Sequence, residues 1–379
     1  MEYRKFGQLD FEVSALGFGC MRLPTKGKDE DVDDAAAVEM LRYAIDHGVN
    51  YLDTAYPYHG GNSERVVAAA LEGGYREKAV VATKMPVWEV KEAGDLDRIF
   101  AEQLARLRTD HVEFYLLHNL QAPTWANMRK LGAIEWLEKL KADGKVGHIG
   151  FSFHDKFEVL KDIIDAHDGW DFCQLQYNYV CEEVQAGTEG LEYAAAQGLG
   201  VVVMEPLFGG TLANPPEPVR RVWDAAEPKA DPVATALKWL WDKPEVSVVL
   251  SGMSTLEQVK QNVRSACAAG VGKMTPREME LIDRAREQYK QLRSIPCTNC
   301  GYCLPCPNGV AIPDNFQLYN NGLVFKGNAQ QLNRNLYADM PAEKQAQSCT
   351  ACGECEDKCP QGIKISEWMP RVHEELTKH

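Results

Sequence analysis

The chain has 379 residues and a formal net charge of −14, from 41 Lys and Arg against 55 Asp and Glu. This length favours two domains, one of them large, and the acidic balance argues against a nucleic-acid partner. No run of the sequence approaches the ~20 apolar residues of a membrane helix. The first residues, from Met1 to Phe6, form no apolar signal segment. We therefore expect a cytoplasmic protein without membrane or nucleic-acid partners.

Short apolar runs alternate with helical patterns along most of the chain. An opening hairpin that turns near Gly7 is expected to plug the floor of the fold, and Gly48 ends a predicted helix over 33–47. Eight strands, each followed by a helix, predict a (β/α)8 TIM barrel of the α/β class. A Rossmann sheet is the alternative, but no G-x-G-x-x-G follows a strand. The predicted strands are 13–19, 50–54, 79–83, 112–117, 148–153, 172–177, 200–204 and 246–251.

Polar residues follow these strands, where the chemistry of such barrels is found. Tyr58 can give a proton to a carbonyl oxygen, and Lys84 can lower the pKa of Tyr58 because a nearby cation favours the phenolate. Asp53 can fix Lys84, and His118 can orient the carbonyl. Singly, each residue also has a structural explanation, such as a helix cap for Asp53, but four compatible groups favour function. The complete set after the strands is Asp53, Tyr58, Lys84, His118, Ser152, Gln174 and Glu205.

Eight of the twelve cysteines lie in two tight runs near the C-terminus. Three Cys at two-residue intervals, followed by Cys-Pro, are typical of [4Fe-4S] ligands, and the fourth Cys usually binds the other cluster of a pair. The second run fits this pattern, while the first is one residue short and leaves room for a single-cluster protein. The sequence predicts two clusters, and at least one. The predicted ligands are Cys297, Cys300, Cys303, Cys306, Cys349, Cys352, Cys355 and Cys359.

Two other roles for these cysteines are weaker. A disulfide framework needs an oxidising compartment, and zinc sites usually pair two Cys-x2-Cys knuckles or add histidines. Helical patterns over 314–320, 329–338 and after Ile365 predict a small, mainly helical ferredoxin-like domain, with Trp368 in its core. We expect the barrel over 1–294 and the 4Fe-4S ferredoxin-type domain over 295–379.

The body of the chain resembles the aldo-keto reductases. The matching residues are Asp53-Thr54-Ala55-x-x-Tyr58, Lys84, Leu116-Leu117-His118, residues 147–152 and residues 174–178. The tail is similar to the branch of the family that has a C-terminal ferredoxin-type domain. The resemblance implies reduction of a small carbonyl substrate with NADP or NAD. Tyr58 would be the general acid, supported by Lys84 and Asp53, and His118 would orient the substrate.

The chain departs from the family pattern where the cofactor would bind. The family usually has Ser-Asn after the fifth strand, whereas Phe153 and His154 follow Ser152 here. After the eighth strand, where the family has a basic set for the 2′-phosphate of NADPH, only Lys260 is basic. The preference between NADP and NAD is therefore open. The resemblance implies a cofactor-binding set of Ser152, Gln174, Glu205, Gly252, Gln258, Gln261 and Asn262.

The pairing of cofactors leaves alternatives open, because nicotinamide gives two electrons at once and a cluster accepts one. The clusters can be structural beside a nicotinamide-dependent reductase. Alternatively, a flavin or a ferredoxin-type electron carrier links them to the barrel site, and Gly209-Gly210-Thr211 is a candidate phosphate-binding turn for the flavin. A non-catalytic redox-sensing barrel is the third hypothesis, and the four compatible groups argue against it. Residues that line either an aromatic substrate pocket or the core are Tyr56, His59, Trp88, Trp125 and Phe153.

Overall fold

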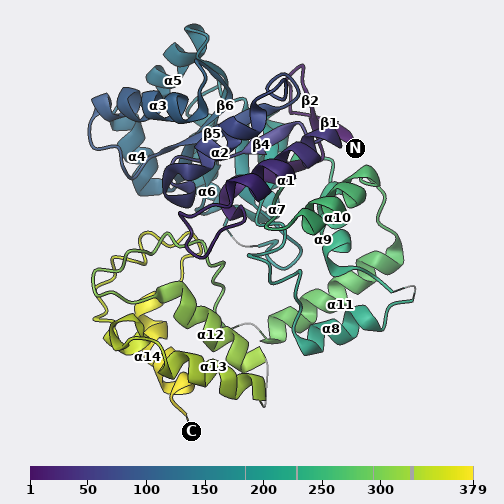
Figure 1. Cartoon of the computed structure of the whole chain (residues 1–379), viewed down its shortest axis with the longest axis vertical. Helices are drawn as coiled ribbons and strands as arrows, with labels where there is room; N and C mark the ends of the chain where they lie inside the picture. The colour runs from purple at the N-terminus through teal and green to yellow at the C-terminus, as the bar shows by residue number, and fades with distance from the viewer. Residues whose placement is uncertain (184, 228, 293, 325–327, 379) are drawn as a thin grey trace. The chain divides into compact units, whose positions relative to one another are not determined.

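Eight parallel strands close into a barrel in the computed structural model, which describes residues 1–183, 185–227, 229–292, 294–324 and 328–378 (Figure 1). Around the barrel the strands follow the order β10-β3-β4-β5-β6-β7-β8-β9. The predicted fold class is confirmed. The barrel strands are β3 (Leu16–Gly19), β4 (Tyr51–Asp53), β5 (Val80–Pro86), β6 (Val112–Leu120), β7 (Val146–Phe153), β8 (Phe172–Gln176), β9 (Gly200–Met204) and β10 (Val248–Gly252).

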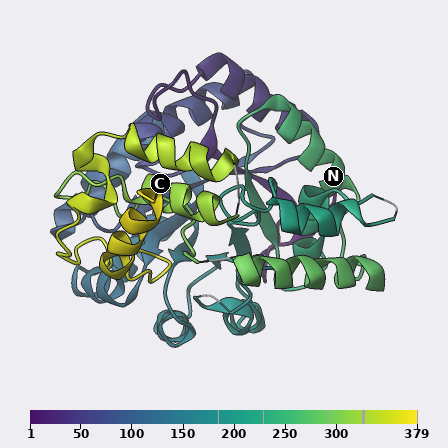
Figure 2. The ribbon, with the colours of Figure 1, turned by 90° about the horizontal axis from the view of Figure 1, so that it is seen from below.

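Helices alternate with these strands, and those of the first half of the chain lie outside the barrel (Figures 1 and 2). Their apolar faces cover the buried strands, as expected for an all-parallel sheet. The helices up to the end of the body are α1 (Asp34–Asp46), α2 (Asn62–Leu71), α3 (Ala93–Leu107), α4 (Ala122–Lys130), α5 (Ala133–Ala142), α6 (Phe157–Asp165), α7 (Gly187–Ala196), α8 (Glu217–Asp224), α9 (Pro232–Trp241), α10 (Leu256–Cys267) and α11 (Pro276–Leu292).

One predicted strand is corrected by the structure. The run 13–19 contains two strands, because β2 (Glu12–Ser14) pairs antiparallel with β1 (Tyr3–Lys5), and β3 enters the barrel only after Ala15. The two strands form the expected opening hairpin. Its residue Phe6 is fully buried, with its ring centroid 5.0 Å from that of Phe114 and 5.6 Å from that of Phe172. The hairpin therefore plugs one end of the barrel, as predicted.

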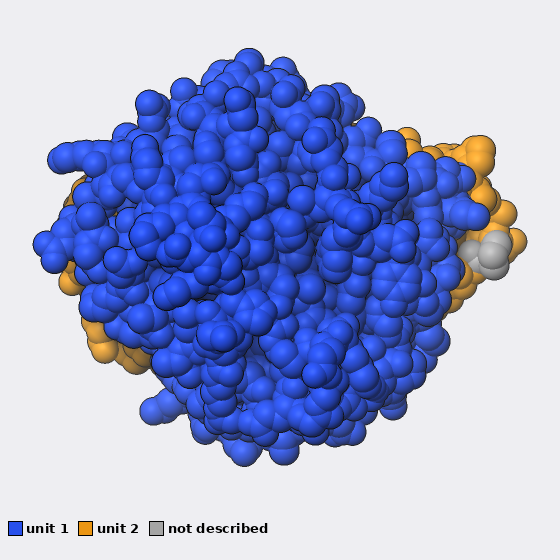
Figure 3. Space-filling model, turned by 90° about the horizontal axis from the view of Figure 1, so that it is seen from above, with its two compact units in different colours: residues 1–206, 236–274 blue, residues 207–235, 275–379 orange. Residues whose placement is uncertain are grey.

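The chain divides into two compact units (Figure 3). The first contains residues Met1–Pro206 and Ala236–Met274, and the second contains Leu207–Thr235 and Thr275–His379. The predicted boundary between 294 and 295 lies within the second unit, and it remains a prediction about separate domains. No helix in the described part of the chain is long and apolar enough to cross a membrane.

The C-terminal part of the second unit is mainly helical, as predicted. It contains α12 (Ile312–Val324), α13 (Asn328–Ala338) and α14 (Ile365–Leu376). These helices share an apolar core with Cys303 and Cys355, and Trp368 packs against this core. The ring centroid of Trp368 lies 5.9 Å from that of Tyr319. One cysteine from each run is therefore buried within the helical core, while others reach its edge.

Candidate active site and cysteine clusters

Four polar residues meet at the C-terminal ends of three neighbouring strands in the first unit. Asp53 ends β4, and Tyr58 begins the short 3-10 helix η2 (Tyr58–Gly61) that follows it. Lys84 lies near the end of β5, and His118 lies near the end of β6. Because parallel strands present their C-terminal ends at one rim of the barrel, these residues gather there although they are far apart in sequence.

Lys84 is the centre of this group. Its Nζ atom donates to Asp53 Oδ1 over 2.6 Å and to the carbonyl oxygen of Thr54 over 2.7 Å. The same atom lies 3.5 Å from the Tyr58 hydroxyl oxygen. The ring of His118 lies edge-on to the Tyr58 ring, with centroids 5.8 Å apart. The structure thus brings all four predicted catalytic residues together.

Burial controls the protonation of this group. It raises the pKa of Tyr58 well above the ordinary value, and the charge of Asp53 adds to that effect. Burial thus outweighs any lowering of the Tyr58 pKa by nearby cations, among which Arg22 acts in the lowering direction, and the effect of Lys84 on this pKa stays a prediction. Burial also lowers the pKa of Lys84 and raises that of Asp53, and their mutual attraction opposes both changes.

His118 is a neutral imidazole at physiological pH. Burial lowers its pKa well below the ordinary value, and the neighbouring Lys84 and His154 act in the same direction. A buried imidazole close to a cation avoids a second positive charge. His118 can therefore donate or accept a hydrogen bond, but it does not store a proton for transfer.

A buried network behind Lys84 was not predicted from the sequence. Gln103 Nε2 donates to the Lys84 carbonyl oxygen over 3.0 Å and to Glu64 Oε1 over 2.9 Å. Arg106 donates to the carbonyl oxygen of Tyr56 over 3.1 Å, and its Nη1 lies 3.4 Å from Glu64 Oε2. The only signal in the sequence was a pair of polar residues on otherwise apolar helix faces. This network holds the backbone carbonyl groups of Tyr56 and Lys84, which lie next to the catalytic group.

Two of the predicted cofactor-binding residues are adjacent in the sheet. Ser152 of β7 pairs in register with Gln174 of β8. The Ser152 hydroxyl oxygen accepts a hydrogen bond from the Asn119 N–H over 2.7 Å, which leaves its own proton available. The Oε1 atom of Gln174 is buried and has no hydrogen-bond partner among the described residues. Such an orphaned acceptor suits the NH2 group of a carboxamide, so the fit to a nicotinamide ring is good.

The other predicted cofactor residues lie at β9, at β10 and at the start of α10. Glu205 adopts a left-handed backbone with φ 56°, and its carbonyl oxygen accepts a hydrogen bond from Asn178. Asn262 is buried and donates to Ser251 Oγ over 3.0 Å. The remaining three, all exposed, are Gly252, Gln258 and Gln261.

Trp88 is the member of the predicted aromatic set that lines a groove. The indole of Trp88 lies 5.1 Å from the His118 ring, centroid to centroid, and lines a groove of about 310 Å³ with residues of the loop after β5 and of α4. Trp125 is buried and donates to Asp162, whereas His59 and Phe153 are buried in the barrel. The Tyr56 hydroxyl donates a hydrogen bond to Glu102 Oε2. The core explanation therefore holds for most of the aromatic set.

The turn at Gly209 and Gly210, the candidate site for a flavin phosphate, packs against another backbone segment of the second unit. Gly209 and Gly210 have φ values of 61° and 88°, and the Gly210 N–H donates to the Leu207 carbonyl oxygen. A Cβ atom added at Gly209 would lie 2.7 Å from the carbonyl oxygen of Thr298, within the same compact unit. Gly209 therefore serves the close packing of two backbone segments, as an ordinary turn does.

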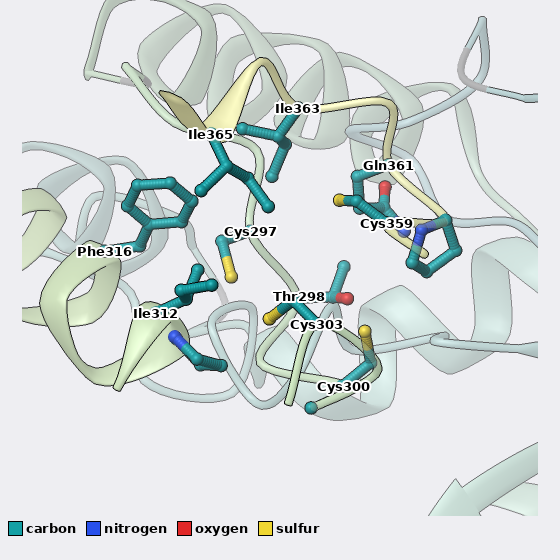
Figure 4. A pocket seen from close by; sticks show the side chains of 13 residues that line it. Cys297, Thr298, Cys300, Cys303, Ile312, Phe316, Cys359, Gln361, Ile363 and Ile365 are labelled. Atoms are coloured by element: carbon teal, nitrogen blue, oxygen red, sulfur yellow. The ribbon is translucent and has the colours of Figure 1, made fainter. Parts of the chain in front are cut away.

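One cavity in the second unit is lined by cysteines from both runs (Figure 4). Cys297, Cys300 and Cys303 of the first run line it together with Cys359 of the second, and Figure 4 shows the four thiols around it. Its other walls are mostly apolar, and include Ile312, Phe316, Ile363 and Ile365. Among the described residues, no three His, Cys, Asp or Glu are placed to hold a single metal ion.

The remaining four cysteines of the two runs, Cys306, Cys349, Cys352 and Cys355, form a second group of neighbouring thiols. Burial raises the pKa of Cys355 to about 11, and the neighbouring Cys349, Cys306 and Cys352 contribute to this rise. Burial likewise raises the pKa of Cys303, and the nearby Cys300, Cys297 and Cys359 act in the same direction. Each group therefore takes three cysteines from one run and the Cys before Pro from the other. This exchange fits the donor sets of two iron–sulfur cubes.

Both parts of the chain match known protein families. Residues 15–287 match the profile of the Aldo/keto reductase family, and residues 296–363 match that of a 4Fe-4S dicluster domain. "Uncharacterized oxidoreductase YqkF" of Bacillus subtilis is 25% identical over 327 residues, which cover 78% of this chain and 100% of that protein. "L-galactose dehydrogenase" of Arabidopsis thaliana is 28% identical over 311 residues, which cover 74% and 94%.

Solved structures agree with these relatives. The aldo-keto reductase AKR11C1 from Bacillus halodurans, in its holo form, superposes with a TM-score of 0.63 at 26% identity, over 75% of this chain and 96% of that one. A putative aldo-keto reductase from Pseudomonas aeruginosa gives a TM-score of 0.55 at 25% identity, over 70% and 94%. The chain therefore belongs to the aldo/keto reductase family and has a C-terminal 4Fe-4S dicluster domain.

Proposed function

We propose that this oxidoreductase reduces a small carbonyl compound with NADH or NADPH, and that Tyr58 donates the proton. The observation that carries the proposal is the buried Lys84 ammonium, which lies 2.6 Å from Asp53 and 3.5 Å from the Tyr58 hydroxyl. A phenol, a fixed cation and a neutral imidazole at one rim of a barrel form a general-acid site. Acid–base catalysis of this kind contributes ~10²–10⁴-fold to the rate.

The resting protonation states suit this reaction. The raised pKa keeps the proton on Tyr58 until the substrate oxygen becomes a strong base. The reduced nicotinamide, when bound, supplies a hydride to the carbonyl carbon. Tyr58 then transfers its proton to the carbonyl oxygen, and Lys84 stabilises the phenolate that remains. His118, as a neutral imidazole, donates a hydrogen bond that orients the carbonyl.

Gln174 and Ser152 are the residues that would hold the nicotinamide carboxamide. The Gln174 acceptor has no partner among the described residues, and the Ser152 hydroxyl keeps one proton to donate. Together they supply one acceptor and one donor, the complement of a carboxamide. In this proposal Glu205, Gly252, Gln258, Gln261 and Asn262 line the rest of the cofactor site.

The cysteine groups favour a second candidate function beside the first. Cys297, Cys300, Cys303 and Cys359 would hold one [4Fe-4S] cluster, and Cys306, Cys349, Cys352 and Cys355 the other. Two clusters carry single electrons, which suits an iron–sulfur reductase that receives electrons from a ferredoxin-type carrier or through a flavin. The clusters would then be part of the electron path rather than structural.

Anaerobic titration separates these two candidates. Purified protein is mixed with NADH or NADPH, and the EPR signal of the clusters is recorded beside a dithionite-reduced sample. Binding of the nicotinamide without cluster reduction, together with oxidation of NADH or NADPH in the presence of carbonyl compounds, supports the first proposal. Reduction of the clusters by either nucleotide supports the second and calls for a search for bound flavin. Absence of nucleotide binding contradicts the nicotinamide proposal.

A further inference from the structure

Arg22 is a cation at the barrel rim that has no role in the proton transfer proposed above. It ends the short 3-10 helix η1 (Cys20–Arg22), directly after β3. Its Nη2 atom is buried and has no hydrogen-bond partner among the described residues. A buried guanidinium nitrogen without a partner costs free energy, and an arginine fork matches oxyanions in geometry and charge. An anionic ligand would satisfy it.

The side chain of Arg22 runs toward the end of β10. A methyl group added at Gly252 would lie 3.3–3.4 Å from Cβ, Cγ and Cδ of Arg22. The Arg22 carbonyl oxygen accepts a hydrogen bond from Ser254 Oγ over 2.9 Å. These contacts fix Arg22 beside the loop from β10 to α10, which holds part of the proposed cofactor site. The absence of a side chain at Gly252 leaves room for the arginine stem.

Arg22 also lies within electrostatic reach of the proton donor. Its charge favours the phenolate of Tyr58, although burial has the larger and opposite effect on the Tyr58 pKa. Arg22 therefore lies beside the end of β10 and acts on the reacting centre through its charge. A ligand anion bound there would belong to a molecule that extends from the proton donor toward the start of α10. A dinucleotide, whose phosphates lie between its two ring systems, has this form.

The loop after β10 does not supply a cation of its own. It consists of Met253, Ser254 and Thr255, and the first basic residue beyond it is Lys260 of α10. We propose that Arg22 binds the pyrophosphate that joins the two halves of the nicotinamide dinucleotide, and so supplies a cation that this loop lacks. This inference rests on the nicotinamide-dependent function proposed above. Charge-assisted bonds between arginine and phosphate are among the stronger hydrogen bonds in proteins.

Direct binding measurements test the proposal without relying on activity. The dissociation constants of NADH and NADPH are measured anaerobically by fluorescence for the wild type, Arg22→Gln and Arg22→Lys. Lys26→Gln serves as a control, because it removes an equal charge from an exposed site. We expect Arg22→Gln to weaken binding about 10- to 100-fold, Arg22→Lys to weaken it less, and Lys26→Gln to leave it unchanged. Thermal unfolding verifies that each variant is folded.

A smaller probe assigns the contact to phosphate. Reduced nicotinamide riboside has no phosphate, so Arg22→Gln and the wild type should bind it equally. If Arg22→Gln binds NADH and NADPH as tightly as the wild type does, the proposal is overturned. An unchanged affinity with a raised KM for a carboxylate-bearing carbonyl compound would likewise overturn it and assign Arg22 to the substrate. If the wild type binds neither NADH nor NADPH, the proposed nicotinamide-dependent function is itself wrong, which differs from a loss of binding in Arg22→Gln alone.

Discussion

Lys84 Nζ and Asp53 Oδ1 lie 2.6 Å apart, and both side chains are almost completely buried. A charge pair in this position is costly to desolvate and is not an efficient way to stabilise a barrel. Its value is that it fixes a cation 3.5 Å from the hydroxyl oxygen of Tyr58. Because Asp53 ends β4 and Lys84 lies in β5, the pairing of these two strands sets the position of the cation beside the candidate proton donor.

Replacing Tyr58 by Phe removes the donor hydroxyl and keeps the ring. We expect turnover of the carbonyl substrate to fall by at least ~10²-fold, with little change in the affinity for the dinucleotide. Steady-state kinetics and fluorescence titration of the same preparation measure both quantities. Tyr56→Phe is the control, since Tyr56 is bonded to Glu102 instead. Near-normal turnover of Tyr58→Phe would exclude Tyr58 as the proton donor.

Lys84→Met should damage both stability and turnover, because it leaves the Asp53 carboxylate buried without its partner. Breaking a buried pair in this way costs about 3–5 kcal/mol. The double variant Lys84→Met/Asp53→Leu should recover most of the unfolding free energy in denaturant titrations but none of the turnover. Recovery of turnover in the double variant would contradict the role of Lys84 in stabilising the phenolate.

Stability should decrease as the pH falls from about 7 to 5. Burial lowers the pKa of His154 to about 4, whereas an unfolded histidine titrates near 6.5. Between these values the unfolded chain binds more protons, so the histidine contribution is complete above pH 6.5 and is lost progressively below it. Its full size is on the order of 3 kcal/mol.

Denaturant unfolding at several pH values measures this slope. His154→Asn should flatten it, because the amide does not titrate. His118 contributes in the same direction, so the double variant with His118→Asn should be flatter still. Ordinary carboxyl groups titrate mostly below this window, which isolates the histidines. An unchanged slope in the double variant would contradict the assignment.

Iron content tests the exchange of cysteines between the two runs. The wild type should contain about eight irons per chain, and Cys359→Ser or Cys300→Ser alone should leave about four. Because both residues line the same cavity, the double variant should also retain about four. Combining Cys359→Ser with Cys352→Ser should instead remove nearly all iron. Cys267→Ser is the control, since Cys267 is an exposed residue of α10. Nearly complete loss of iron in the first double variant would contradict the grouping.

Much of the architecture was predictable because its signals are local. Apolar runs and helix-stop glycines located the barrel strands, and the range 200–204 agrees with the observed β9. The main error, a single strand over 13–19, arose because the apolar pattern continues through Ala15 while the hydrogen bonding changes from the hairpin to the barrel. Sequence periodicity does not record which strand a backbone pairs with.

The sequence by itself determined the chemical groups of this protein: a phenol, a lysine, a carboxylate and an imidazole after successive strands, and two runs of cysteines in the tail. Only the tertiary structure decided which of them are neighbours and in which state. Burial set the pKa directions of Tyr58 and His118, and folding brought Cys359 to the first run. It also left Arg22 at the rim with a buried nitrogen that has no partner in the described part of the chain. Residue spacing is encoded along the chain, whereas desolvation and long-range contacts arise only when distant segments pack together.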